Sequence, residues 1–193
     1  MKIYSHETSL LIGDTEKLPF DINQEIDIDK LQEDVKNRLE YGIASQSGIR
    51  QIFDPDYGDA PTSYSDGEDL TKYKDKDGAE ITDAAKIHVA TIADTFVELL
   101  KNRTGKTNLT ILVAIDSRHT GPAIADIIVR IFAFHGVKVK YTFITPVTEM
   151  VVYSRKDCDG FIYISASHNP WCYNGLKIGL NDGCLLHREL ANE

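Results

Sequence analysis

Apolar residues recur every three or four positions in four segments, which is the spacing of helices that bury one face. These segments begin near residues 28, 82, 121 and 146. Thr82 suits the N-cap of its helix, and Pro122 suits the first turn of the next one. Gly42, Gly105 and Gly136 follow where the first three helices are expected to end. The pattern therefore predicts four helices.

Continuous apolar runs of strand length alternate with these helices. They lie at residues 109–115, 137–144, 161–164 and 176–180. Alternation with short connections favours right-handed crossovers and parallel pairing. We therefore predict an α/β fold, a three-layer α/β/α domain with a mixed, mostly parallel sheet. The stretch 45–79 is rich in Gly, Asp and Ser and is predicted to be a loop, and Asn181–Gly183 is a turn signal for a hairpin.

The length of 193 residues suits a single domain with a substantial buried core. We assign residues 1–193 to one domain, with an N-terminal extension and helix over 1–40 and the core over 41–193. The sequence stops after residue 193 without an obvious terminal element. We therefore expect it to be a piece of a longer, multi-domain protein.

The formal net charge of −9 argues against nucleic acid and anionic membranes as partners, because such surfaces repel an acidic protein. No apolar run reaches the length of a signal-peptide core or a transmembrane helix. The three cysteines lack paired spacing, which favours reduced thiols and a cytoplasmic location. An anionic substrate would need a local cluster of cations and backbone N–H groups.

Two loops, at residues 116–120 and 165–175, follow predicted strands of the sheet. In sheets of this kind ligands bind just beyond the carboxyl ends of the strands. Ser167 lies in the second loop, two or three residues past a buried strand. Its hydroxyl is a candidate nucleophile or phosphate carrier, although turn preferences alone would also explain a Ser-His-Asn-Pro run.

Cationic residues around Ser167 favour a functional role for it. Lys177 lies ten residues further on and would return close to the serine on a neighbouring strand. Arg118 and Arg50 lie in two other loops. Together these side chains would form the local positive site that an acidic protein needs to bind phosphate. For Arg118, a structural salt bridge is the alternative.

Three motifs of this sequence resemble those of the α-D-phosphohexomutases, the superfamily of phosphoglucomutase and phosphomannomutase. Ser165–Pro170 with the downstream Tyr173–Lys177 is similar to the family's active-site signature, T-A-S-H-N-P followed by Y-N-G-x-K. Ser47–Arg50 resembles its S-G-x-R loop, and Asp116–Gly121 resembles its D-x-R-x-x-G loop. The matches occur in family order and together point to this superfamily.

The resemblance implies an intramolecular phosphotransferase that interconverts sugar 1- and 6-phosphates through a bisphosphorylated sugar. Ser167 would be the phosphorylated serine and, through its phosphate, a ligand of Mg²⁺. Lys177 would serve as general base or acid for the sugar hydroxyl, helped by His168. The expected partners are a phosphosugar substrate and a hexose bisphosphate.

The resemblance also assigns binding roles around the serine. Arg50 would contact the phosphoserine or the sugar phosphate, Arg118 would lie at the phosphate site, and Asn169 would shape the serine loop. Trp171 could stack on a sugar or pack the loop against the core. Gln51 is a departure, because the family usually has a second Gly after the Arg of the early loop.

The family's Asp-rich metal loop, D-G-D-x-D-R, is absent from these 193 residues. The resemblance therefore implies further mutase domains in cis, and we expect the chain alone to bind magnesium poorly and to lack mutase activity. A non-catalytic phosphosugar-binding or regulatory module with the same fold is the alternative. A serine hydrolase using Ser167 and His168 is disfavoured, because adjacent side chains on extended backbone point apart and the G-x-S-x-G glycines are missing.

Overall fold

The computed structural model describes residues 2–4, 11–14, 27–41, 43–45, 48–53 and 81–186. Its helices are α1 (Ile28–Tyr41), α2 (Asp83–Thr104), α3 (Gly121–Phe134) and α4 (Val147–Ser154). All four predicted helices are confirmed. Thr82 caps α2 by accepting a 3.2 Å hydrogen bond from the amide of Ala85, and Gly105 ends that helix with a left-handed φ of 66°.

Within the described residues, eight strands lie in two sheets. A two-stranded sheet pairs β1 (Lys2–Tyr4) antiparallel with β2 (Leu11–Asp14). The main sheet contains β3 (Ile43–Ser45), β4 (Gly48–Ile52), β5 (Thr110–Ile115), β6 (Lys138–Ile144), β7 (Gly160–Ile164) and β8 (Tyr173–Leu180). Its strand order is β3-β4-β8-β7-β5-β6. None of the helices in the described ranges combines the length and apolar composition that a membrane-spanning segment needs.

The main sheet is mixed, as predicted, but the prediction that it is mostly parallel is wrong. β5 pairs parallel with both β6 and β7. The pairings β7–β8, β8–β4 and β4–β3 are antiparallel, so the parallel part is limited to β6, β5 and β7. The antiparallel half arises because β8 turns straight back along β7 instead of crossing over through a helix.

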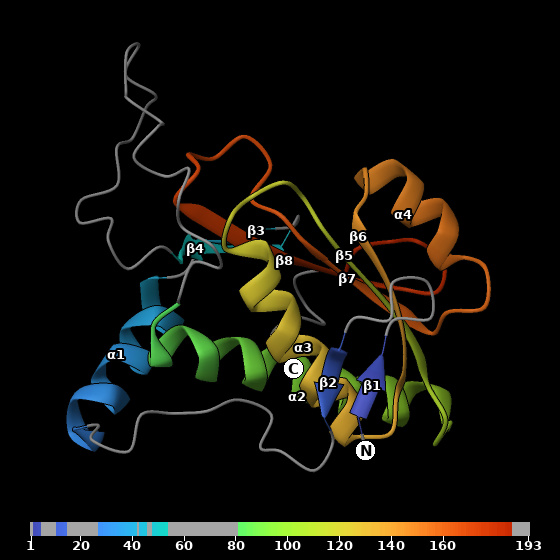
Figure 1. Ribbon diagram of the computed structural model, residues 1–193, viewed down its shortest axis with the longest axis horizontal. Coiled ribbons are helices and arrows are strands. Elements are labelled where there is room, and N and C mark those ends of the chain that lie inside the picture. The colour runs from blue at the N-terminus through green and yellow to red at the C-terminus, as the bar shows by residue number, and fades with distance from the viewer. Residues whose placement is uncertain are drawn as a thin grey trace.

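Two hydrophobic clusters lie on opposite faces of the sheet and make the fold three-layered. On one face, α2 and α3 pack on alternate residues of β5 and β7, such as Ile111 and Ile162. On the other face, Met150 of α4 packs against Leu112 and Phe161. Figure 1 shows α2 and α3 on one side of the sheet and α4 on the other. The α/β/α class is therefore confirmed.

The prediction of a loop over residues 45–79 is wrong at its N-terminal end. Residue 45 belongs to β3, and β4 covers most of the following residues up to Ile52. β4 owes its place to pairing with β8, which begins at Tyr173 and not at the predicted residue 176. Such pairing between distant segments leaves no local pattern. The rest of the predicted loop, residues 54–79, lies outside the described residues.

The predicted hairpin after β8 is confirmed in short form. The amide of Gly183 donates to the carbonyl of Leu180 at 3.0 Å, and the amide of Leu180 donates to the carbonyl of Cys184 at 3.0 Å. A single bridge between Gly179 and Leu185 continues the pairing. The turn residues Asn181–Gly183 therefore return the chain along β8.

Candidate active site

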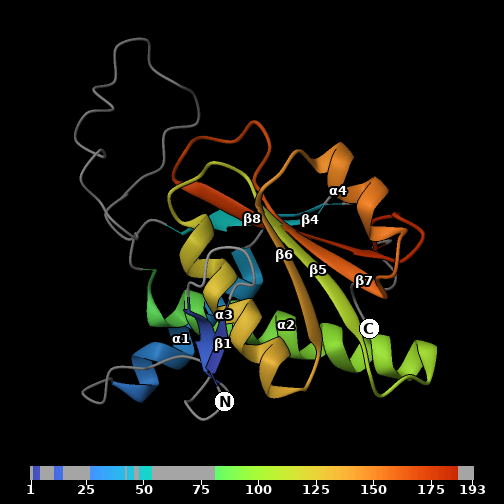
Figure 2. The same cartoon turned by 45° about the vertical axis from the view of Figure 1, so that its right-hand side comes forward.

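A cavity of about 720 Å³ lies beyond the carboxyl ends of β5 and β7. In both cartoon views the loop after β5 and the loop between β7 and β8 lie together at this end of the sheet (Figure 2). The side chains that line the cavity come mainly from these two loops and from the adjoining strands. They are Asp116, Ser117, Arg118, His119, Val147, Tyr163, Ser165, Ser167, Trp171 and Lys177.

Ser167 and Lys177 meet at this cavity. The Nζ atom of Lys177 donates a 2.8 Å hydrogen bond to Oγ of Ser167. β8 runs antiparallel to β7 and pairs Lys177 with Tyr163, which brings the lysine back to the end of the sheet where the serine loop starts. Ser167 has a φ of 58°, in the left-handed region that non-glycine residues rarely adopt. Strain of this kind persists only where surrounding contacts hold it.

The environment of Lys177 favours loss of its proton. The residue is 9% exposed, and Nζ lies 5.4 Å from the ring centroid of Tyr163. Burial is the main cause that lowers the pKa of Lys177, the positive charges of Arg50 and Arg118 lower it further, and Asp116 opposes them. An amine with a lowered pKa can exchange a proton near neutral pH more readily than a surface lysine.

Arg118 connects the two loops. It forms an ion pair with Asp116, in which Nε lies 3.1 Å from Oδ2, and Asp116 also accepts a hydrogen bond from the amide of Arg118. The rest of its guanidinium donates hydrogen bonds of 2.6 to 2.9 Å to backbone carbonyls of the serine loop, residues 165–172 between β7 and β8, and of the first residue of β8. These carbonyls belong to Ser167, Asn169, Pro170 and Tyr173. The role of Arg118 as a phosphate contact stays a prediction.

His168 and Asn169 follow Ser167 but are not among the residues that line the cavity. The side chain of His168 is exposed. The amide of Asn169 donates to the carbonyl of Ala166 at 3.2 Å, and its own carbonyl accepts from Arg118. The backbone of Asn169 thus takes part in shaping the loop, while the roles of both side chains toward a sugar stay predictions.

Arg50 is brought toward the site by β4. In the β4–β8 register Arg50 pairs with Gly175, two residues before Lys177. It is close enough to Lys177 to lower the pKa of that lysine, although it does not line the cavity itself. Its predicted contact with a phosphate stays a prediction.

Gln51, the departure from the family motif, takes part in a buried polar network. Its Oε1 accepts a 2.7 Å hydrogen bond from Arg38 of α1, and its Nε2 donates to the carbonyl of the same residue at 2.6 Å. The Nδ1 atom of His88 lies 3.0 Å from the same Oε1. Burial, and secondly the charge of Arg38, lower the pKa of His88 to about 4. The side chain of Gln51 therefore links α1, β4 and α2, at a position where the family motif usually has a glycine and no side chain is present to form these bonds.

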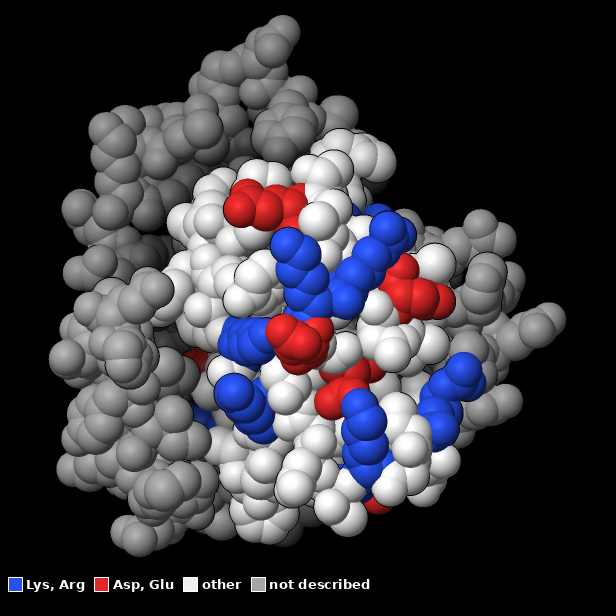
Figure 3. All heavy atoms as spheres, turned by 90° about the vertical axis from the view of Figure 1, so that its right-hand side faces the viewer, with Lys and Arg blue, Asp and Glu red and all other residues white. Residues whose placement is uncertain are grey.

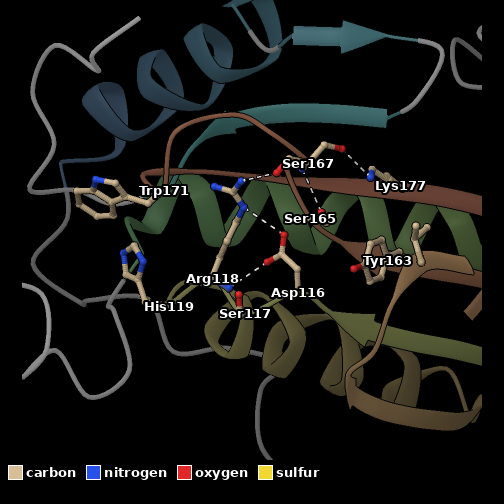
Figure 4. A pocket seen from close by; sticks show the side chains of 10 residues that line it. Asp116, Ser117, Arg118, His119, Tyr163, Ser165, Ser167, Trp171 and Lys177 are labelled. Atoms are coloured by element: carbon tan, nitrogen blue, oxygen red, sulfur yellow. Dashed lines mark hydrogen bonds and ion pairs between the residues drawn. The ribbon is translucent and has the colours of Figure 1, made fainter. Parts of the chain in front are cut away.

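Trp171 lines the cavity, but its neighbours Tyr163, Ser165 and His119 were not predicted from the sequence as site residues. Oγ of Ser165 accepts a 3.1 Å hydrogen bond from the amide of Ser167, and Tyr163 lies beside Lys177. The two-residue periodicity of a strand could have indicated Tyr163, because alternate residues face one side. The rings of His119 and Trp171 form another wall, with centroids 5.1 Å apart (Figure 4). No sequence signal joins these two rings, since they lie on different loops.

The described residues do not form a magnesium site by themselves. Among them, no group of three or more His, Cys, Asp or Glu side chains is placed to hold a metal ion. Asp116, which lines the cavity, is already engaged by Arg118. The described residues therefore do not fit the Mg²⁺ implied by the resemblance, unless a phosphate on Ser167 and residues from elsewhere provide the oxygens that this ion requires.

Comparison with known proteins identifies the family. The model of the phosphoglucomutase/phosphomannomutase α/β/α domain I matches residues 72–193. The chain is 35% identical over 83 residues to a phosphoglucomutase of Staphylococcus epidermidis and 37% identical over 89 residues to a phosphoglucosamine mutase of Prochlorococcus marinus. The chain therefore belongs to the phosphoglucomutase/phosphomannomutase family, where it corresponds to the first α/β/α domain, and the resemblance seen in its motifs is confirmed.

These relatives are much longer than the matched segment. The two matches cover 42% and 46% of this chain but only 15% and 20% of the relatives. A crystal structure from Thermus thermophilus, assigned provisionally to the phosphomannomutases, superposes with a TM-score of 0.54 at 20% identity. That superposition covers 77% of this chain and 28% of the other. It supports the fold class.

Proposed function

We propose that this chain is the phosphoserine-carrying domain of a phosphohexomutase. The observation that carries the proposal is the 2.8 Å hydrogen bond from Lys177 to Ser167 at a strand-end cavity. Membership of the family supports the reaction class, in which a phosphoryl group moves between positions of a sugar. The substrate is a sugar phosphate, and the intermediate is a hexose bisphosphate.

In the proposed first step, a hydroxyl of the sugar monophosphate attacks the phosphorus of phosphorylated Ser167. The new sugar O–P bond forms, the P–Oγ bond breaks, and the serine oxygen leaves with the electron pair of that bond. Neutral Lys177 accepts the proton of the sugar hydroxyl and delivers a proton to Oγ, so its charge is the same before and after. His168 is the second candidate for handling the sugar proton.

The second step reverses the first at the other end of the sugar. Lys177 takes the proton of the Ser167 hydroxyl as Oγ attacks the second phosphate of the bisphosphate and forms the Oγ–P bond. The sugar O–P bond breaks, and Lys177 returns the proton to the sugar oxygen that leaves. Arg50 would bind a phosphate, and Asn169 would help to present the loop. A divalent cation would neutralise phosphate charge during transfer, with ligands supplied largely by domains in cis.

The test is phosphorylation of Ser167 in the complete protein that contains this chain. The protein is incubated with glucose 1,6-bisphosphate, and its intact mass and peptides are measured. We expect one added phosphoryl group, located on Ser167, and turnover of a hexose 1-phosphate. The variant Ser167→Ala should lose both the modification and the turnover.

Ser154→Ala is the matched control, because Ser154 is a buried serine of α4 whose hydroxyl donates within its own helix to Val151. It should keep both the modification and the turnover. Absence of phosphate on Ser167 of the wild type would contradict the proposal. Binding of a sugar phosphate without any phosphorylation would instead favour the non-catalytic phosphosugar-binding module.

A further inference from the structure

Arg118 has every one of its donors engaged by the protein. An arginine side chain carries five N–H groups, one on Nε and two on each terminal nitrogen. Nε of Arg118 donates to Asp116 at 3.1 Å. Nη1 donates at 2.6 and 2.9 Å to the carbonyls of Pro170 and Tyr173, and Nη2 donates at 2.9 and 2.8 Å to those of Ser167 and Asn169. A phosphate would find no donor left unless one of these bonds broke.

The shape of the serine loop depends on this arrangement. Three carbonyl oxygens of the serine loop and that of Tyr173, at the start of β8, converge on a single guanidinium, and without it their partial negative charges would repel one another. The Arg118 side chain is only 10% exposed, so water cannot readily replace it. Figure 4 shows the guanidinium between the Asp116 carboxylate and the backbone of the serine loop.

The same loop holds Ser167 in its unusual backbone conformation. A φ of 58° is disfavoured for serine and must be maintained by other contacts. The carbonyl of Ser167 itself is one of the four acceptors, so Arg118 acts directly on the strained residue. The backbone direction at Ser167 determines where its Oγ points, and here Oγ faces Lys177.

We propose that Arg118 is a positioning residue that holds the serine loop by its backbone carbonyls, so that Oγ of Ser167 faces Lys177, and that it does not itself bind the substrate phosphate. Its effect on turnover rests on the proposed function. Its effect on the loop does not, because the loop geometry can be measured without any reaction.

The substitutions Arg118→Lys and Arg118→Gln separate positioning from charge. Lysine keeps the positive charge but has a single donor nitrogen, whereas the two terminal nitrogens of Arg118 each donate to two carbonyls. A lysine therefore cannot bind all four carbonyls. In the complete protein we expect both variants to lose about 100-fold in kcat, because misplacing a reacting group by about 1 Å costs that much, with KM for the sugar phosphate changed less than about threefold. A phosphate ligand would behave differently, with a raised KM and with activity largely kept in Arg118→Lys.

Hydrogen exchange of the backbone amides of residues 167–169 and 171–173 gives the readout that does not depend on catalysis. Both variants should exchange faster there than the wild type, with unchanged exchange in α2. Arg155→Lys is the matched control, because Arg155 also donates to a backbone carbonyl, that of Asp182 at 2.8 Å, on an exposed turn. It should leave turnover and the exchange of the serine loop unchanged.

A second variant keeps the proposal testable if the Arg118 variants do not fold. Asp116→Asn retains the size of the side chain that orients Arg118 but removes its charge, and should show the same changes to a smaller degree. The proposal is overturned if Arg118→Lys keeps both activity and loop exchange within about threefold of the wild type. If the wild type shows no turnover, the proposed function fails, while loop exchange still decides the positioning role.

Discussion

Lys177 is the ionisable residue on which the proposed proton transfer depends. Its Nζ contacts Oγ of Ser167, and its pKa is lowered chiefly by burial and then by Arg50. Because the neutral amine is the form that accepts a proton, the rate of phosphoryl transfer should rise with pH until the lowered pKa of Lys177 is passed. That rise should occur at lower pH than for an ordinary lysine.

Removing the amine should therefore slow the chemistry without removing the serine. We expect Lys177→Gln to reduce the single-turnover rate of phosphoryl transfer by about 10²- to 10⁴-fold and to flatten its pH dependence. Rapid quench experiments with labelled hexose bisphosphate measure this rate. Lys101→Gln is the control, since Lys101 pairs with Glu98 on the surface of α2. Equal rates in wild type and Lys177→Gln would rule out a role of the amine in proton transfer.

His88 should make the stability of the domain depend on pH. Its pKa is about 4 in the folded state against an ordinary 6.5. Below pH 6.5 the imidazole of His88 binds a proton in the unfolded state but stays neutral in the folded state. The free energy of unfolding therefore decreases as the pH falls from 6.5 to about 4. The loss attributable to His88 should approach about 3 kcal/mol at the acid end.

Urea unfolding of the wild type and of His88→Gln, followed from pH ~7.5 to ~4.5, measures this effect. Glutamine keeps a donor for Gln51 but does not titrate in this range. Its stability should therefore fall less steeply with pH than that of the wild type. Parallel pH dependences for the two proteins would show that His88 is not the group responsible.

At the scale of the elements, β4 and β8 approach closely at Gly175. A Cβ at this position would lie 2.4 Å from the carbonyl oxygen of Ile49 and 3.0 Å from that of Ser165. The carbonyl of Gly175 also accepts a 2.8 Å hydrogen bond from the amide of Ser165. Glycine at this position thus lets β4 lie against β8 and keeps the start of the serine loop in place.

We expect Gly175→Ala to destabilise the domain by about 1–3 kcal/mol or more, because backbone atoms must move apart. Gly105→Ala is a useful comparison, since its Cβ would meet nothing within 4 Å and the cost comes only from a φ of 66°. That cost should be about 1 kcal/mol. Urea denaturation of both variants measures the difference, and a Gly175→Ala protein no less stable than Gly105→Ala would contradict the predicted steric conflict.

Arg38 attaches the helix α1 to the sheet. Besides its bonds to Gln51, Arg38 donates to the carbonyl of Ile52 at 2.8 Å and lies over the ring of Phe53. Arg38→Met should cost about 1–3 kcal/mol and speed hydrogen exchange in α1, because buried acceptors lose their donor. Arg103→Met, at an exposed position of α2, should change neither quantity. Unchanged exchange in α1 of Arg38→Met would show that other contacts hold it.

At the scale of the whole molecule, basic side chains lie at the cavity although the chain carries a formal charge of −9. On the face shown in Figure 3, basic and acidic side chains lie next to one another. Arg118 and Lys177 line the cavity, and Arg50 lies near it. We infer that capture of an anionic sugar depends on Arg50 and on further domains, and not on a long-range field, because Arg118 is already engaged by Asp116 and by backbone carbonyls.

The isolated 193-residue chain should therefore lack mutase turnover and bind Mg²⁺ weakly, with a dissociation constant well above that of the complete protein. Titration calorimetry with MgCl₂ and an assay for hexose 6-phosphate measure the two properties. The complete protein is the control. Turnover by the isolated chain at a rate similar to that of the complete protein would contradict the expected dependence on domains in cis.

The sequence by itself determined the four helices, the strands β5 to β7 and the position of Ser167. These features follow from local periodicity, caps and a short motif, each of which is written in neighbouring residues. The loop motif also brought Lys177 into consideration. Its place near Ser167 was predictable because the strand that carries Lys177 follows the serine loop directly and was expected to lie next to the strand before it.

Only the tertiary structure decided the place of β4, the network of Gln51 and the contacts of Arg118. β4 is a strand because it pairs with β8, more than a hundred residues away in the sequence. Arg118 donates to backbone carbonyls, which every residue possesses. The residue types of the serine loop therefore do not indicate that Arg118 binds there. Such contacts depend on register and on the path of the backbone, which exist only once the sheet has formed.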